Sequence, residues 1–290
     1  MKAERIIIAH RGLDPSRRNY FAESSHEAFT DQLARGFGLE FDPQLTADGG
    51  IVVVHDSNLR RMTGGHDMRK IQEVSTAELL SFRFSDCRLT TLTELLREIG
   101  KQGKMHPISA LHLKRGWQEE KRLDVLLSEL EKADPRKFII FDVAVAAAEY
   151  LKERNGDLVL APSVAHPYDV ARYNEEVGGT LMQAEEVIGN RNLFDWVWLD
   201  EWDLKAPEGT KKFYTKETFS IFRNAGMKIA LVTPELHATS PGLLGGEAHE
   251  DATTRERLEI RMREIAALGP DAVCTDYPDL MRDILAQSTG

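Results

Sequence analysis

The chain has 290 residues, of which 42% are hydrophobic and 29% are charged, and its formal net charge at pH 7 is -10. A chain of this length suits one large α/β domain or two smaller ones and is too long for most simple sandwiches. The acidic balance argues against nucleic acid and against an anionic membrane surface as partners, so any positive charge for an anionic substrate must be concentrated locally.

The N-terminus and the cysteines bear on the cellular compartment. The apolar run in the first residues, MKAERIIIAHRG, is too short for a signal peptide, and no stretch approaches membrane-spanning length. Cys87 and Cys274 are far apart and have no metal or redox spacing, which argues against a disulfide framework. We therefore expect a soluble, cytoplasmic protein that does not bind a membrane, and no feature of the sequence specifies an oligomeric state.

The first predicted strand, residues 5–9, is a β-branched apolar run that ends in His10-Arg11-Gly12. A His-Arg pair at the end of a strand, followed by a polar loop, suits catalysis, although a strand-end histidine bonded to backbone would give the same pattern. A helix then runs to Ala34, and the spacing of Ser24 and Glu27 predicts a capping box at its start.

The stretch from Gly38 to Asp56, GLEFDPQLTADGGIVVVHD, reads as a strand, a glycine-containing turn and a second strand. Strand side chains alternate between faces, so Glu40 and Asp42 share one face and repel each other unless a cation lies between them. The hairpin turn brings His55 back toward these carboxylates. The stretch predicts a divalent metal with oxygen ligands and an imidazole nearby. The alternative is an edge hairpin with solvated acids on its outer face.

The rest of the chain alternates short strands with helices. Main strands are predicted at residues 5–9, 38–42, 107–113, 137–141, 158–161, 196–199, 228–232 and 272–274, with 51–54 as an extra hairpin strand. Helices are predicted at 24–34, 77–82, 91–99, 119–132, 143–154, 216–225 and 254–268, with further helical stretches up to residue 187.

This alternation predicts a parallel sheet, and eight such units in roughly 250 residues predict a (β/α)8 TIM barrel. We expect a single domain over residues 1–290, with a β-hairpin after the second strand. The alternative is an open doubly wound sheet. Its nucleotide-binding versions are disfavoured because no Gly-x-Gly-x-x-Gly or Walker-type loop follows the first strand.

A barrel gathers its chemistry at the C-terminal ends of its strands. The polar side chains found there or on the hairpin include His10, Arg11, Glu40, Asp42, His55, His112, Lys114, Asp200 and Asp276. Two histidines, two carboxylates and two cations suit cleavage of a small anionic phosphodiester. A metal and the cations would neutralise the phosphoryl oxygens, one imidazole would take a proton from the attacking hydroxyl, and the other would protonate the leaving alkoxide.

Most of these candidate residues lie in short sequence motifs, and further motifs lie nearby. They are His10-Arg11-Gly12, Ala22-Glu23-Ser24, Ala28-Phe29, Glu40-Phe41-Asp42, Thr46-Ala47-Asp48-Gly49, His55-Asp56 and Thr275-Asp276-Tyr277-Pro278. In combination they resemble the glycerophosphodiester phosphodiesterase family, which belongs to the phosphatidylinositol-phospholipase-like barrels. The resemblance is dense over roughly the first third of the chain and thin through the middle.

The resemblance implies a phosphoric diester hydrolase that uses one divalent metal ion. It implies acid/base roles for His10 and His55, metal-ligand roles for Glu40 and Asp42, and substrate contacts for Arg11, Lys114 and Glu23. The metal that the family usually binds through these two acids is magnesium or calcium.

His112 departs from the family pattern, in which a third carboxylate ligand lies two residues before the lysine. An imidazole removes one negative charge and offers a nitrogen donor that suits manganese, zinc or cobalt. The metal, one of magnesium, calcium or manganese, therefore depends on His112, and we expect it to act as the third ligand. The alternative is a direct contact between a cationic His112 and the phosphate.

The segment Trp198-Leu199-Asp200-Glu201-Trp202-Asp203 forms an unusual strand end. Trp202 is predicted to stack on a polyol or sugar, and Asp200 to accept hydrogen bonds from its hydroxyl groups. The alternative is a rim loop whose tryptophans pack against neighbouring helices.

Two other function classes fit the same residues. One is a lyase or transferase in which a substrate hydroxyl attacks phosphorus and a cyclic phosphate is released, since two histidines also serve that chemistry. The other is a non-catalytic phosphodiester-binding barrel that has lost its third carboxylate. The presence of both histidines, both acids and the lysine argues against the binding barrel.

Overall fold

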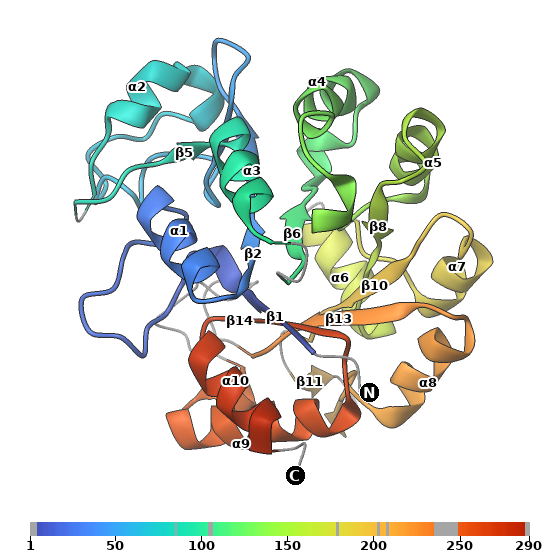
Figure 1. The fold of residues 1–290 in the computed structure, drawn as a ribbon. Coiled ribbons are helices and arrows are strands. Elements are labelled where there is room, and N and C mark those ends of the chain that lie inside the picture. Colours follow the sequence, from blue (N-terminus) through green and yellow to red (C-terminus); the bar gives the residue numbers. More distant parts are fainter. Residues whose placement is uncertain are drawn as a thin grey trace.

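A computed structural model describes residues 5–84, 86–103, 107–177, 180–201, 204–206, 209–234 and 249–287. Its largest sheet is parallel and has the strand order β8-β7-β6-β2-β1-β14-β13-β10-β9. The two edge strands, β8 (Val159–Ala161) and β9 (Ser163–Val164), are separated in the chain only by Pro162. Residues 159–164 therefore join both edges, and the sheet closes into the predicted (β/α)8 TIM barrel, with helices around the strands (Figure 1).

The predicted strands and most predicted helices are confirmed, with ends shifted by a few residues. The other barrel strands are β1 (Ile6–Ala9), β2 (Gly38–Phe41), β6 (Ser109–His112), β7 (Phe138–Phe141), β10 (Trp196–Leu199), β13 (Lys228–Val232) and β14 (Ala272–Thr275). The α-helices are α1 (His26–Ala34), α2 (Thr76–Ser81), α3 (Leu92–Lys101), α4 (Glu120–Leu130), α5 (Val145–Arg154), α6 (Pro167–Val177), α7 (Ala184–Gly189), α8 (Lys216–Asn224), α9 (Arg255–Leu268) and α10 (Pro278–Gln287).

Helix α10 was absent from the prediction, although Met281, Ile284 and Leu285 are buried on one face of it. Shorter elements complete the fold. They are η1 (His10–Gly12), η2 (Ile71–Glu73), η3 (Arg115–Trp117), η4 (Pro135–Lys137), η5 (Glu250–Ala252) and the small antiparallel pair β11 (Lys205–Ala206) and β12 (Gly209–Thr210).

Side-chain alternation along the strands divides the core into two clusters. The cluster inside the barrel contains Ile8, Ala110, Ile139, Phe141, Ala161, Trp196, Trp198, Ala230, Ala272 and Cys274. The outward side chains pack in a larger cluster with the helices, and Leu39 and Phe41 of β2 belong to it. Glu40 and Asp42 alternate with these two residues, so they lie on the interior side, at the C-terminal end of the strand.

The hairpin after the second strand is confirmed, but its pairing differs from the prediction. Strand β4 (Ile51–Val53) pairs with β3 (Pro43–Leu45) and β5 (Thr90–Thr91), not with residues 38–42. Strand β2 is unavailable because both of its edges pair with barrel strands, β1 and β6. The backbone N–H of Val54 donates to the carbonyl of Asp42 at 2.9 Å, so the hairpin still returns the chain to the acidic pair.

The predicted capping box at the start of α1 is wrong. The N-cap is Ser25, whose Oγ accepts the N–H of Ala28 at 3.1 Å. Ser24 precedes it in the left-handed region at φ 56°. The carboxylate of Glu27 accepts the N–H of Arg88 at 3.0 Å instead of closing back on the helix start.

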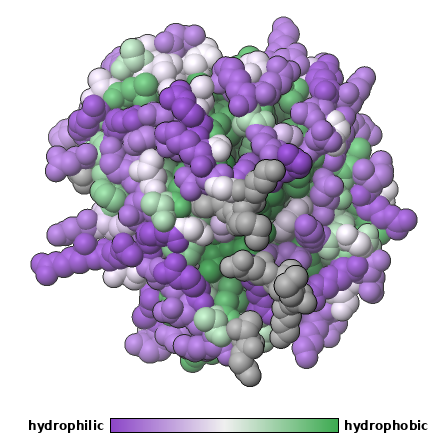
Figure 2. Space-filling model, in the orientation of Figure 1, coloured by the Kyte–Doolittle hydropathy of each residue, from purple (hydrophilic) through white to green (hydrophobic). Residues whose placement is uncertain are grey.

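The surface agrees with the acidic, charged composition. The face shown in Figure 2 is mostly hydrophilic. Within the described ranges, no helix combines the length and the apolarity needed to cross a bilayer.

Candidate active site

Four neighbouring barrel strands, in the order β6-β2-β1-β14, place the main candidate residues together. His112 ends β6, Glu40 lies on β2, His10 directly follows β1, and Asp276 directly follows β14. Each has the same alternation as the residues that fill the barrel interior, so their side chains meet at its C-terminal mouth.

His10 is held between two acids. Its Nδ1 is hydrogen-bonded to Oδ1 of Asp276 at 2.8 Å, and its Nε2 lies 3.9 Å from Oε2 of Glu40. The next residue, Arg11, has φ 50°, and its backbone N–H donates to the same Glu40 oxygen at 3.2 Å. The Asp276 carboxylate orients the imidazole, which leaves Nε2 directed at the acidic centre.

The acidic pair, Glu40 and Asp42, is almost completely buried. Burial and the neighbouring Asp42 carboxylate raise the pKa of Glu40. Burial also acts to raise the pKa of Asp42, but the nearby charge of Lys114 and the hydrogen bond from His112 outweigh it and hold that pKa well below its usual range. Lys114, whose Nζ lies 3.0 Å from Oδ1 of Asp42, places positive charge on the Asp42 side of the pair.

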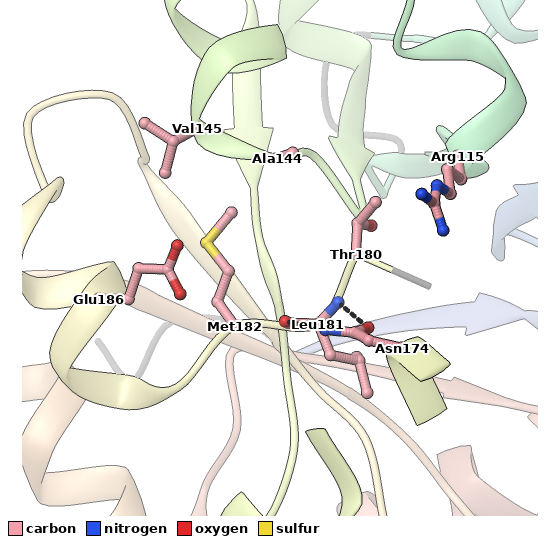
Figure 3. Close-up of a pocket in the computed structure, with 8 residues that line it drawn as sticks. All are labelled: Arg115, Ala144, Val145, Asn174, Thr180, Leu181, Met182 and Glu186. Atoms are coloured by element: carbon pink, nitrogen blue, oxygen red, sulfur yellow. Dashed lines mark hydrogen bonds between the residues drawn. The ribbon is translucent and has the colours of Figure 1, made fainter. Parts of the chain in front are cut away.

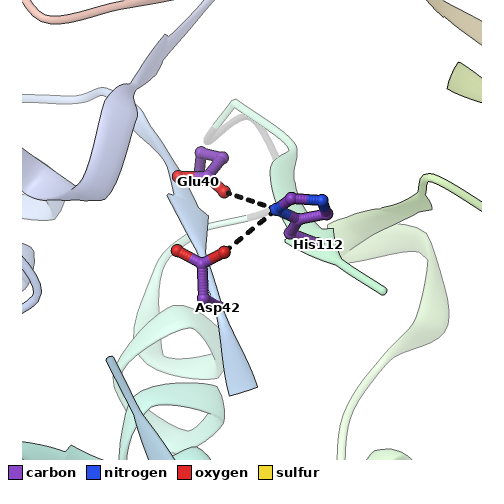
Figure 4. A group of neighbouring side chains, drawn as sticks. All are labelled: Glu40, Asp42 and His112. Atoms are coloured by element: carbon purple, nitrogen blue, oxygen red, sulfur yellow. Dashed lines mark hydrogen bonds and ion pairs between the residues drawn. The ribbon is translucent and has the colours of Figure 1, made fainter. Parts of the chain in front are cut away.

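His112 completes the group shown in Figure 4. Its Nδ1 is hydrogen-bonded to Oδ1 of Asp42 at 2.9 Å and lies 3.9 Å from Oε1 of Glu40. Its Nε2 lies 3.5 Å from Oδ2 of Asp142. Burial alone would lower the pKa of His112, but the carboxylates of Asp142 and Asp42 outweigh burial and raise the pKa to about 9.

The group of Glu40, Asp42 and His112 fits a divalent cation. One ligand atom from each residue lies within 4.8 Å of the other two. Among the described residues, Oδ2 of Asp42 is buried and has no hydrogen-bond partner. A buried carboxylate oxygen is costly to leave unpaired, and a metal ion at this point would satisfy it. Two carboxylates and one imidazole form a mixed oxygen and nitrogen donor set for a divalent cation.

Lys114 connects the acidic pair to the hairpin. Its Nζ lies 3.0 Å from Oδ1 of Asp42 and donates to the backbone carbonyl of His55 at 2.7 Å. The Nδ1 of His55 is hydrogen-bonded to Oδ1 of Asp56 at 2.9 Å. Burial and the charge of Arg11 lower the pKa of His55 to about 4. The hairpin therefore presents a neutral imidazole beside the cationic edge of the site.

Two arginines surround Glu23. One of its carboxylate oxygens lies 3.8 Å from Nη1 of Arg11, and the other accepts a hydrogen bond from Nη2 of Arg61. Arg61 also binds Asp56 through Nε at 2.7 Å and Nη2 at 2.9 Å. Glu23 thus joins the loop after β1 to the loop after β4, at the side of the site where Arg11 lies.

Asp200 and Trp202, the predicted substrate contacts after β10, differ in what can be said of them. Asp200 directly follows β10 and is 9% exposed. It helps to raise the pKa of Tyr173 and of Tyr214, in both cases after burial as the larger cause. Trp202 lies outside the described residues.

The sequence of this chain matches the model of the Glycerophosphoryl diester phosphodiesterase family over residues 10–280. The chain belongs to that family. Its members are phosphoric diester hydrolases, and the predicted family resemblance is confirmed.

Individual relatives agree with this assignment. A Glycerophosphodiester phosphodiesterase from Caldanaerobacter subterraneus subsp. tengcongensis is 32% identical over 102 residues, which are 33% of this chain. The match spans about two fifths, 40%, of that relative.

Solved structures share the fold. A Glycerophosphoryl diester phosphodiesterase from Parabacteroides distasonis has a TM-score of 0.66 at 20% identity, covering 98% of this chain and 87% of its own. A phosphodiesterase from Oleispira antarctica, in complex with the product sn-glycerol-3-phosphate, has a TM-score of 0.64 at 18% identity, covering 97% and 96%.

One neighbour of the site in this family member was missed at the level of sequence, namely Asp142. It directly follows Phe141, which faces the barrel interior, so strand alternation would direct Asp142 outward. The backbone of Asp142 instead adopts φ 62°, and its carboxylate lies near His112. The only sequence signal was an acid at a strand end, and the turn that redirects it depends on surrounding contacts.

A hollow of about 440 Å3 lies at the ends of β6, β7 and β9 (Figure 3). Thr180 lines this hollow, and its hydroxyl donates a hydrogen bond to the Asp142 carboxylate, which in turn lies near His112. The hollow is therefore separated from His112 by the side chain of Asp142. The residues that line it are Arg115, Ala144, Val145, Asn174, Thr180, Leu181, Met182 and Glu186.

Proposed function

We propose that this chain is a metal-dependent phosphodiesterase that hydrolyses a small glycerophosphodiester. The observation that carries the proposal is that Glu40, Asp42 and His112, which could hold a metal ion, lie between an acid/base side chain and a cationic side chain. His10 lies 3.9 Å from Glu40 on one side, and Lys114 lies 3.0 Å from Asp42 on the other. An anion, a divalent cation and an acid/base group can meet at such a point.

In this proposal Glu40, Asp42 and His112 hold the metal ion. When bound, a divalent ion supplies charge neutralisation for the phosphoryl oxygens and makes phosphorus a better electrophile. His112 lies between the carboxylates of Asp42 and Asp142, at 2.9 and 3.5 Å, and a metal ion would take the place of its Nδ1 proton to make it a ligand. Manganese or another transition ion suits this mixed donor set better than calcium.

The protein groups supply the remaining chemistry. Lys114 and Arg11 contribute positive charge for the phosphate on either side of the metal group. His10 and His55 act as the acid/base pair, each with its Nδ1 hydrogen-bonded to a carboxylate. One accepts the proton of the attacking water as the new P–O bond forms. The other gives a proton to the leaving alkoxide as the old P–O bond breaks, so the proton count balances.

The alcohol side of the substrate is proposed from two observations. The Oleispira antarctica phosphodiesterase binds the product sn-glycerol-3-phosphate, and we infer a glycerol-phosphate moiety for this chain as well. Asp200, buried at the end of β10, would accept hydrogen bonds from the polyol hydroxyl groups. Trp202 is proposed to stack on the same group.

The test is a product-resolved assay. The protein is incubated with sn-glycerophosphodiesters in 18O-enriched water with manganese, magnesium or calcium, and products are followed by phosphorus NMR. Hydrolysis predicts a phosphomonoester that carries the 18O isotope shift. A cyclic phosphate resonance would identify the lyase reaction instead, and no turnover with any metal would leave a binding barrel.

The histidine roles are tested in the same assay. We expect His10→Gln and His55→Gln each to lose about 10²-fold or more in turnover, the usual effect of removing a general acid or base. His66→Gln is the matched control, because His66 is exposed in the loop after β4. Near-normal rates in either site variant, with an unchanged circular dichroism spectrum, would contradict the assignment.

A further inference from the structure

The ring of His112 is restrained on three sides by the protein. Its Nδ1 faces Asp42 and Glu40, and its Nε2 faces Oδ2 of Asp142 at 3.5 Å. One face of the ring stacks on Phe141, with centroids 4.6 Å apart and an interplanar angle of 15°. The imidazole therefore has its plane set by an aromatic ring and each nitrogen set by a different carboxylate.

The restraint continues into the barrel interior. Phe141 stacks in turn on Trp198 at 3.9 Å and 15°, so the three rings form a column across β6, β7 and β10. Phe141 and Trp198 are both buried in the cluster that fills the barrel. The plane of His112 is thus fixed from the core outward, and the polar groups decide only which of the two orientations, related by a 180° flip about Cβ–Cγ, the ring adopts.

Asp142 is itself held in an unusual conformation. It has φ 62°, a region that costs free energy for a residue other than glycine and is most accessible to Asn and Asp. Its carbonyl oxygen accepts hydrogen bonds from Nε2 of Gln118 at 2.7 Å and from the Thr180 hydroxyl at 3.0 Å. The Thr180 hydroxyl also donates to Oδ1 of Asp142. These bonds occupy Oδ1 and leave Oδ2 directed at His112.

We propose that Asp142 is a positioning residue that makes His112 a metal ligand. A bound metal ion would replace the proton that Nδ1 donates to Asp42, and Asp142, by accepting the Nε2 proton, then holds the ring tautomer in which the Nδ1 lone pair faces Glu40 and Asp42. A carboxylate behind a metal-bound histidine is a frequent device in metalloproteins, where its removal lowers metal affinity about 10- to 100-fold. The pair of Asp142 and His112 thereby takes the place of a single third carboxylate. This inference rests on the metal site of the proposed function.

Metal binding without substrate tests the proposal. By calorimetry with manganese, Asp142→Ala is expected to bind about 10- to 100-fold more weakly than the unmodified protein. Asp142→Asn keeps an acceptor oxygen and tolerates the left-handed backbone, so it is expected to recover part of the affinity. The matched control is Asp86→Ala, which removes another aspartate at φ 62° from an exposed turn and should leave affinity unchanged.

A second background separates positioning from a general structural role. In a His112→Glu variant the ligand has no ring to orient, and its charge is repelled by Asp142. Adding Asp142→Ala should then leave manganese affinity unchanged or increase it, the opposite of its effect beside His112. In addition, long-range 1H–15N spectra of the zinc-loaded protein should show a single His112 tautomer, protonated at Nε2, that is lost in Asp142→Ala.

Three results would overturn the proposal. They are unchanged affinity in Asp142→Ala, an equal loss of affinity in the His112→Glu background, and a His112 tautomer that does not depend on Asp142. Each of these leaves the metal site itself intact. If the unmodified protein binds no manganese, the metal-dependent function and this inference both fail. Failure of the inference alone is therefore distinguishable from failure of the proposed function.

Discussion

The buried ion pair of Glu201 and Arg261 offers a sharp test of how the barrel is stabilised near its mouth. Glu201 is the second residue after β10, and its Oε1 accepts a hydrogen bond from Nη2 of Arg261, a residue of α9, at 2.6 Å. Its Oε2 accepts the N–H groups of Phe213 and Tyr214 at 2.6 and 3.1 Å. The side chain is 2% exposed. We predict that Glu201→Gln, which keeps the shape and an acceptor oxygen but removes the charge, destabilises the fold.

Two estimates of the magnitude agree. Burial acts to raise the pKa of Glu201, but the His249 imidazole, whose Nε2 lies 3.6 Å away, and the charge of Arg261 outweigh it and lower the pKa from 4.5 to about 2. A shift of this size corresponds to roughly 3 kcal/mol of stability at neutral pH, at about 1.4 kcal/mol per pH unit. Breaking a buried pair by removing one charge typically costs about 3 to 5 kcal/mol. We therefore expect Glu201→Gln to lose about 3 kcal/mol at pH 7.

The pH dependence gives the sign. A carboxylate with a depressed pKa stabilises the fold above its unfolded pKa of about 4.5, and this contribution is lost as the pH falls toward about 2. The difference between the unmodified protein and Glu201→Gln should therefore be full at pH 7 and roughly halved at pH 3. Urea unfolding followed by tryptophan fluorescence measures it at both values.

The control uses the same arginine. Glu264 also accepts a hydrogen bond from Arg261, at 2.8 Å, but its side chain is 52% exposed. Glu264→Gln should therefore cost less than about 1 kcal/mol, as surface pairs do. The reasoning would be refuted by a Glu201→Gln protein within 1 kcal/mol of the original at pH 7, or by a difference that does not change with pH.

Three further outcomes are expected. Glu40→Gln and Asp42→Asn should each lose manganese binding and activity, and unaltered calorimetric binding in both would count against the metal site. His112→Glu should shift the preferred metal from manganese toward magnesium or calcium, and an unchanged metal profile would favour a phosphate contact for His112. Gly38→Ala should destabilise the fold by about 1 to 3 kcal/mol and so lower the melting temperature, because a Cβ there would lie 2.2 Å from the carbonyl oxygen of Ile108. An unchanged melting temperature would refute the inference that β2 and β6 approach too closely for a side chain at this position.

Local sequence patterns were sufficient to predict the barrel, but they were misleading for the pairing of the hairpin and for the cap of α1. The spacing of apolar runs predicted every barrel strand except β9 (Ser163–Val164), because a strand must be apolar to be buried. The hairpin pairing was wrong because the strand at residues 38–41 looks the same whether its edge is open or taken by β1 and β6. The capping box was wrong because Arg88, remote in sequence, binds the carboxylate of Glu27.

The candidate site divides in the same way. Strand ends and strict alternation were enough to predict that Glu40, Asp42, His112 and Lys114 would share the barrel mouth, because both rules are local. The pairing of His10 with Asp276 joins segments near opposite ends of the chain, and only the folded sheet brings them together.

Asp142 shows the limit most clearly. Alternation directs its side chain away from the site, and the observed turn exists only because groups from other elements stabilise a left-handed backbone there. Local sequence patterns were enough to name candidate residues for a metal site and for phosphodiester cleavage. The tertiary structure decided which carboxylate faces which nitrogen, because those contacts depend on packing between elements far apart in the chain.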